Sequence, residues 1–439
     1  MATPQTAGLA QAEAVPAFNR WLIPVAAVAV HICIGSVYAW STFNRPIKAI
    51  FPTSPWWFSP PYTTFTTALV LLGLSAAVGG PWVERRGPRA AATAAAFFFG
   101  SGLVIGGLGL AIHQSVLVWI GMGLIGGIGC GLGYISPVST LVKWFPDRRG
   151  MATGMAIMGF GGGAFLAGYL NVYCMGLFGV ARTMMVLGVT YFIIMMIGAR
   201  IIRRPPPNWK PAGWTPSMRT NKMITARSVS RNDALGTVQF YLLWGILFVN
   251  VTAGIGILAQ ASPMMQDLFR KTALEAGAIV SIISLFNAGG RFFWASLSDY
   301  IGRRNTYLTF FIVQVALFLL IPTFAANGSW VPFEIAIFTV FTMYGGGFAT
   351  VPAFLADIFG EDNVGAIHGA LLTAWSAAAV VGPVIITQLS ERAKAALAPG
   401  ESRVHIYDQP LRVLACFLVV GFALTLLVRP LKQADFSGS

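Results

Sequence analysis

Arg291 is the residue of this sequence whose chemistry is hardest to reconcile with its neighbours. Between Ala273 and Leu297 only Glu275 and Arg291 are charged, and the rest of the stretch is suited to lipid. A guanidinium near the bilayer centre costs roughly 2.5 to 3.5 kcal/mol even on insertion-based scales. Arg291 therefore needs an anionic partner, an aqueous cavity or a path to the membrane surface.

The acids of the chain do not offer an obvious partner for Arg291. No Asp or Glu lies deep in an apolar segment, because Glu275 and Glu334 fall near segment ends. A planar guanidinium binds a carboxylate through two parallel hydrogen bonds, so the missing counter-charge favours a carboxylate ligand. Asn287, one helical turn earlier, is expected to orient the guanidinium or to donate to the ligand. The alternative is snorkelling towards Asp299, about 12 Å along the helix axis.

Aromatic and imidazole side chains are further candidates to line a cavity. His31 and Tyr38 are seven residues apart, which places them within about 20° on one helical face, and Gly35 leaves room between them. Tyr134 and Tyr344 lie in glycine-rich apolar segments. Interhelical hydrogen bonding for the tyrosines and a packed neutral state for His31 are the alternatives. Because histidine titrates near neutral pH, His31 is the candidate proton carrier.

The elements that must position these residues are membrane helices. Of the 439 residues, 56% are hydrophobic and only 10% are charged, whereas soluble domains carry about a quarter charged residues. A span needs about 20 mostly apolar residues. The sequence predicts an all-α membrane protein with twelve such spans, at 21–43, 62–82, 90–112, 115–141, 151–171, 178–200, 237–260, 274–298, 306–326, 332–357, 366–389 and 410–428.

The distribution of basic residues explains the net charge of +14 without nucleic acid. Nineteen of the 29 lysines and arginines fall on the side of the N-terminus, nine fall on the other side, and Arg291 lies within a span. This asymmetry is that of the positive-inside rule. It predicts a multi-pass protein of the cell membrane with both termini cytoplasmic.

Neither a metal site nor an enzyme active site is expected. The four cysteines lie in apolar spans without metal-type spacing, and the four histidines show no ligand spacing. With no acid in mid-span, there is also no nucleophile with a base beside it. The sequence predicts no cofactor.

An internal repeat divides the chain into two related halves. GPWVERRGPR at 80–89 and ASLSDYIGRR at 295–304 match at an offset of 215, which pairs Glu84 with Asp299. The same offset pairs Pro137 with Pro352, and also Gly150 with Gly365. The predicted organisation is a tail at 1–20, a six-helix half at 21–202, a Pro-rich basic linker at 203–235, a second half at 236–428 and a tail at 429–439.

These loops resemble the signature G-x-L-A-D-R-x-G-R-R of the major facilitator superfamily and its weaker second copy. Trp82 and Pro88 depart from the first copy, and Ala295 and Tyr300 depart from the second. The resemblance implies two pseudo-symmetric six-helix halves with a substrate site near the membrane midplane. It also implies a cytoplasmic gate of charge-assisted bonds, made by Glu84, Arg85, Arg89, Asp299, Arg303 and Arg304. The alternative is that these arginines only set the topology.

A second resemblance is more specific. Asn287-x-x-x-Arg291 followed by SLSD, together with KWFPDRRGMATG at 143–154, resembles monocarboxylate transporters and bacterial oxalate/formate antiporters. It implies that Arg291 holds the substrate carboxylate and that Tyr38 lies on a pocket helix. Animal monocarboxylate transporters have an Asp for proton coupling where this chain has Asn287. The antiporters have a second cation, a Lys, at the position aligned with Trp375.

A single buried cation favours a monoanion, so the predicted substrate is a monocarboxylate resembling lactate or pyruvate. Moving one negative charge against an inside-negative potential costs about 2.3 kcal/mol per 100 mV. Proton symport removes this cost, and exchange of the oxalate/formate type is the alternative. The sequence therefore predicts an alternating-access transporter in the lipid bilayer, with a proton as co-substrate and a monomer as functional unit.

Overall fold

The structure is a computed structural model that describes residues 18–53, 60–206, 209–211, 228–398 and 403–431. Most of the predicted tails at 1–20 and 429–439, and residues 207–208 and 212–227 of the predicted linker at 203–235, lie outside these residues. Helices of the first half are α1 (Leu22–Gly35), the 3-10 helix η1 (Ser36–Ala39), α2 (Ser41–Ile50), α3 (Pro60–Arg86), α4 (Pro88–Ala111), α5 (Ser115–Val118), the π-helix η2 (Trp119–Gly126), α6 (Gly127–Trp144) and α7 (Arg149–Ile201). Those of the second half are α8 (Arg231–Leu235), α9 (Val238–Phe269), α10 (Ala273–Ile301), α11 (Arg303–Ala326), α12 (Trp330–Phe359), α13 (Val364–Leu371), α14 (Thr373–Ala395), the 3-10 helix η3 (Arg403–His405) and α15 (Asp408–Leu427).

All twelve predicted spans appear as helices. Within the described residues, 11 continuous helical stretches are long and apolar enough to cross a membrane. One of them, α7, contains both spans predicted at 151–171 and 178–200. Gly179, with φ 75° and ψ 166°, interrupts its helical backbone, a conformation that glycine adopts at little cost. The prediction of an all-α fold with twelve membrane helices is confirmed.

The repeat recurs in the backbone conformation. Gly87, between α3 and α4, has φ 93° and ψ 159°, and Gly302, between α10 and α11, has φ 86° and ψ 147°. These two residues occupy equivalent positions at the offset of 215. Both need the positive φ that favours glycine, so each turn is made in the same way in both halves.

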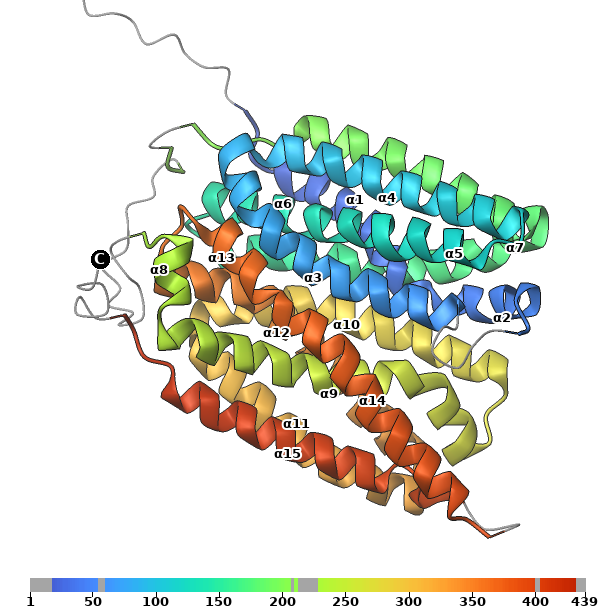
Figure 1. Cartoon of the computed structure of the whole chain (residues 1–439). Helices are drawn as coiled ribbons and strands as arrows, with labels where there is room; N and C mark the ends of the chain where they lie inside the picture. The colour runs from blue at the N-terminus through green and yellow to red at the C-terminus, as the bar shows by residue number, and fades with distance from the viewer. Residues whose placement is uncertain (1–17, 54–59, 207–208, 212–227, 399–402, 432–439) are drawn as a thin grey trace, which may run out of the picture.

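The two halves pack side by side as a bundle of roughly parallel helices, with α1 to α7 along one side and α9 to α15 along the other (Figure 1). Small residues allow close approach where they meet. A side chain on Gly161 of α7 would come within 3.0 Å of the Ala288 Cα of α10, and one on Gly80 of α3 would come within 2.8 Å of the Ala366 Cα of α13. The glycine-rich segments therefore serve helix packing between the halves.

Candidate substrate site

Arg291 lies in the middle of α10, and its side chain has no exposed surface. Its Nε donates to Asn287 Oδ1 at 3.0 Å, and its Nη1 donates to the carbonyl oxygen of Ile157 in α7 at 3.3 Å. Its Nη2 is buried and has no hydrogen-bond partner among the described residues. The guanidinium bonds back towards the start of α10, the direction that helical side chains favour, and does not extend towards Asp299.

Two phenylalanines, one from each half, flank this guanidinium. The Arg291 Cζ lies 5.5 Å from the ring centroid of Phe160 in α7 and 5.2 Å from that of Phe348 in α12. Such cation–π contacts are worth about 0.5 to 2 kcal/mol, most when desolvated. Sequence reasoning missed both rings, although each stands beside the glycine runs GFGGG and YGGGF. Neutral groups thus provide the contacts that the structure gives Arg291.

The structure brings the predicted aromatic residues together around Trp375 of α14. Its ring centroid lies 4.4 Å from Phe348, 5.4 Å from Tyr134 and 6.1 Å from Tyr38. Tyr38 of η1 and Tyr344 of α12 approach each other across the halves, with 3.1 Å between their hydroxyl oxygens. Tyr134, Tyr344 and Trp375 have no exposed surface, whereas Tyr38 is partly exposed.

Two histidines from opposite halves pack against Tyr134. His31 of α1 lies 5.4 Å from the Tyr134 ring centroid, and its Nδ1 is 3.0 Å from the Ala27 carbonyl oxygen. His368 of α13 lies 5.9 Å from the same ring. Sequence reasoning considered His368 only for metal-ligand spacing and did not predict it as a residue of the site. The signal was a lone polar residue within the small-residue run GAIHGALL.

Several buried polar atoms in this cluster lack a partner among the described residues. They are Arg291 Nη2, His31 Nε2, Tyr134 Oη, His368 Nδ1 and Trp375 Nε1. Leaving a buried polar group unpaired costs about 1 to 3 kcal/mol, so most such groups in proteins are hydrogen-bonded. A small polar ligand with several hydrogen-bond acceptors matches this set of unpaired atoms.

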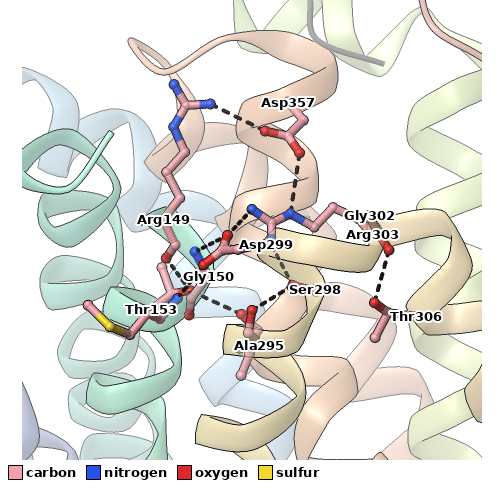
Figure 2. Close-up of polar contacts among 12 residues, drawn as sticks. Arg149, Gly150, Thr153, Ala295, Ser298, Asp299, Gly302, Arg303, Thr306 and Asp357 are labelled. Atoms are coloured by element: carbon pink, nitrogen blue, oxygen red, sulfur yellow. Dashed lines mark hydrogen bonds and ion pairs between the residues drawn. The ribbon is translucent and has the colours of Figure 1, made fainter. Parts of the chain in front are cut away.

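A second polar cluster joins the halves at the end of the bundle where α7 and α11 begin (Figure 2). Asp299 of α10 accepts hydrogen bonds from the backbone N–H groups of Gly150 at 3.1 Å and Met151 at 3.0 Å. Arg303 donates to Asp299 at 2.5 Å and to Asp357 of α12 at 3.3 Å. Arg149 of α7 binds Asp357 at 3.3 Å and also forms an ion pair with Glu361. We call Arg149, Asp299, Arg303 and Asp357 the gate cluster.

In the other half of the repeat, Glu84 makes a contact that corresponds to that of Asp299 with the start of α7. Its carboxylate accepts from the backbone N–H of Gly365 at 3.0 Å and from Lys143 Nζ at 2.6 Å. Glu84 and Asp299 are paired by the offset of 215, as are Gly365 and Gly150. Each acid therefore binds the start of a helix in the opposite half, where the helix dipole favours negative charge.

The other predicted gate arginines bind within their own half. Arg85 donates to the Pro81 carbonyl oxygen at 3.3 Å, Arg89 to that of Arg200 at 2.9 Å, and Arg304 to that of Leu426 at 2.7 Å. Sequence reasoning missed three residues that bond across the halves, Arg149, Lys143 and Asp357. All three lie near helix ends. Lys143 and Arg149 belong to KWFPDRRGMATG, which was interpreted through its family resemblance and its basic residues and not as part of a gate.

The comparisons with known proteins agree with this fold. The family model described as Major Facilitator Superfamily matches residues 20–383. The chain is 30% identical over 369 residues to an oxalate:formate antiporter of Oxalobacter formigenes, with 83% of each chain covered. It is 22% identical over 458 residues to apicoplast pyruvate carrier 1 of Toxoplasma gondii, with 80% of each covered.

Solved structures of the same fold cover nearly the whole chain. The transporter FucP in the outward conformation superimposes with a TM-score of 0.65 at 12% identity, covering 94% of this chain and 100% of that one. A bacterial homologue of ferroportin gives a TM-score of 0.67 at 13% identity, covering 92% and 98%. With the matched family model and the duplicated six-helix halves, these likenesses lead to one conclusion: the chain belongs to the Major Facilitator Superfamily of membrane transporters.

Proposed function

We propose that this transporter carries a small monocarboxylate resembling lactate or pyruvate, and that Arg291 binds its carboxylate. The observation that carries the proposal is a fully buried guanidinium whose bonded partners are neutral and whose Nη2 has no partner among the described residues. A carboxylate at Nη2 would supply the missing charge and the missing acceptor. Asn287 holds Nε and so orients the fork.

The remaining site residues favour a monoanion with a further neutral oxygen. Trp375 Nε1 is a neutral donor, and Tyr134 Oη is a neutral hydroxyl. Both suit a 2-hydroxy or 2-oxo group better than a second carboxylate, for which a cation would be the stronger partner. Tyr38 and Tyr344 close the site across the halves through their hydroxyl contact. Relatives named for oxalate, formate and pyruvate support a small carboxylate.

The residues around Arg291 and the gate cluster together suit an alternating-access mechanism. The gate cluster, together with Glu84 and Lys143, holds the halves together at the end we assign to the cytoplasm. Breaking these bonds would open the site inward, and forming them would leave it accessible from outside. We assign both termini to the cytoplasm, in agreement with the basic residues at this end. We also propose that the functional unit is the monomer.

Proton symport is the coupling mode we propose, with His31 as the proton carrier. An anion entering alone would move against an inside-negative potential, at about 2.3 kcal/mol per 100 mV. His31 has an unpaired Nε2 beside the site. His368, facing the same Tyr134 ring from the other half, is a second candidate carrier. A proton bound with the carboxylate makes the transported charge zero.

Exchange of two anions is the second candidate, and one observation favours it. Without a bound anion, Arg291 has only neutral partners when buried. Reorienting the empty transporter therefore buries an uncompensated charge, which is costly. Reorienting with an anion bound avoids this cost, and the relative at 30% identity is named as an antiporter.

Proteoliposomes distinguish the two modes. Symport predicts concentrative lactate uptake driven by an inward proton gradient in vesicles without internal substrate. Exchange predicts uptake only into vesicles preloaded with a carboxylate. Absence of carboxylate uptake under both conditions, with folded protein, would overturn the proposed function.

His31→Asn tests the proton carrier, with His113→Asn as the matched control. His113 is exposed in the turn after α4 and has φ 56°, a conformation that asparagine tolerates. Symport through His31 predicts that H31N loses substrate-driven proton uptake while H113N retains it. Unchanged proton uptake in H31N would remove His31 from the mechanism.

A further inference from the structure

A cavity lies on the side of the bundle, apart from the site around Arg291. Its volume is about 410 Å³, within the range of about 300 to 1,000 Å³ typical of ligand sites. None of the seven predicted substrate-site residues lines it. Its walls include Ala77 of α3, Arg231 of α8, Phe240, Tyr241 and Trp244 of α9, and Ala370 of α13. We call it the Arg231 cavity.

The cavity combines apolar walls with one cation. Arg231 is the only charged residue among those lining it, and its Nε is buried without a hydrogen-bond partner among the described residues. Asp233, the nearest acid in sequence, accepts instead from the Ser230 hydroxyl at 2.6 Å. Trp244 Nε1 is already bound to Thr373 at 2.9 Å. Within the part of the chain that the structure describes, Arg231 therefore forms no ion pair, and its buried Nε donates no hydrogen bond.

The cavity lies at the exposed side of α9 and at the end of the bundle that carries the gate cluster. Tyr241 is 61% exposed and belongs to the part of α9 that is long and apolar enough to cross a membrane. Val229, two residues before Arg231, donates to the Phe359 carbonyl oxygen at 2.8 Å, which places the cavity at the gate end. Ala77 and Ala370 belong to opposite halves, so an occupant would contact both halves at once.

We propose that the Arg231 cavity binds an anionic phospholipid, with the phosphate on Arg231 and an acyl chain against Phe240 and Trp244. Basic pockets between membrane helices on the cytoplasmic side are suited to anionic headgroups. A soluble anion would gain nothing from the aromatic walls, whereas an acyl chain gains from burial against them. Because the lipid touches α3 and α13 together, it stabilises the arrangement in which the gate is closed.

Lipid retention by the purified transporter tests this proposal. The protein is reconstituted in phosphatidylcholine vesicles containing phosphatidylglycerol with a photoreactive acyl chain. Bound lipid is counted by native mass spectrometry, and labelled peptides are mapped. Wild type is expected to retain phosphatidylglycerol and to be labelled in the segment containing Phe240 and Trp244. Arg231→Gln is expected to reduce retention at least tenfold.

The matched control is Arg86→Gln, an exposed arginine at the same end of the bundle that does not line the cavity. R86Q should retain phosphatidylglycerol as wild type does. Ala77→Leu, which narrows the cavity and leaves Arg231 in place, should reduce acyl-chain labelling and serves if R231Q fails to fold. Equal retention and labelling in wild type, R231Q and A77L would overturn the proposal. So would competition by inorganic phosphate, which would indicate a soluble-anion site. Both readouts are independent of carboxylate transport.

Discussion

Replacing Arg291 by lysine tests carboxylate capture most directly, because lysine keeps the charge and removes the fork. In the structure Nε is held by Asn287 at 3.0 Å and Nη1 by Ile157 at 3.3 Å, while Nη2 has no hydrogen-bond partner in the described part of the chain. A lysine ammonium can still contact Phe160 and Phe348, but it loses the fixed orientation and one of the two bonds to the ligand. A hydrogen bond to a charged group contributes about 1.5 to 3 kcal/mol. At about 1.4 kcal/mol per tenfold, R291K should raise the Kd about 10- to 100-fold.

The measurement is equilibrium binding of radiolabelled lactate or pyruvate to purified protein in detergent. Arg304→Lys is the matched control, because Arg304 is also an arginine that donates to backbone carbonyls, at the gate end and away from the site. Its affinity should equal that of wild type. Equal affinity in R291K and wild type would refute two-bond carboxylate capture, whatever the outcome with R304K.

Three further predictions concern Trp375, the gate cluster and the cap at the start of α10. Trp375→Lys places a second cation in the site and should shift preference from monocarboxylates to dicarboxylates such as oxalate, measured by competition binding; unchanged preference would argue against this position facing the ligand. Asp299→Asn weakens charge-assisted bonds to Arg303 and the start of α7, each worth about 1.5 to 3 kcal/mol. Maleimide should therefore label Thr153→Cys at least tenfold faster from the gate end in an otherwise cysteine-free chain, and no acceleration would contradict the gate role. At the start of α10, hydrogen bonds from the Thr272 backbone and side chain lower the pKa of Glu275. A carboxyl whose folded pKa is lowered stabilises the fold above its unfolded pKa and stops doing so as pH falls through the folded value. Glu275→Gln should therefore lower the Tm at pH 7 and have a diminishing effect below about pH 4; a pH-independent difference would contradict this assignment.

Much of the fold was predictable because it depends on local properties of the chain. Each membrane span needs only a sufficient run of apolar residues, and basic loops indicate orientation by their composition. Gly87 and Gly302 marked equivalent turns because both turns require positive φ. The two spans within α7 were separable in sequence, and the non-helical backbone of Gly179 marks the point where they meet.

Arg291 and Asn287 were also recognisable from the sequence alone, since an unpaired cation in an apolar run and its neighbour one turn away are local features. The tertiary structure decided what surrounds them. Phe160, Phe348 and His368 reach the site from three different helices, α7, α12 and α13, and the pairing of Glu84 with Gly365 joins opposite halves. Hydropathy and spacing describe which face of a helix is apolar, but only the packing of twelve helices determines which side chains from different helices meet.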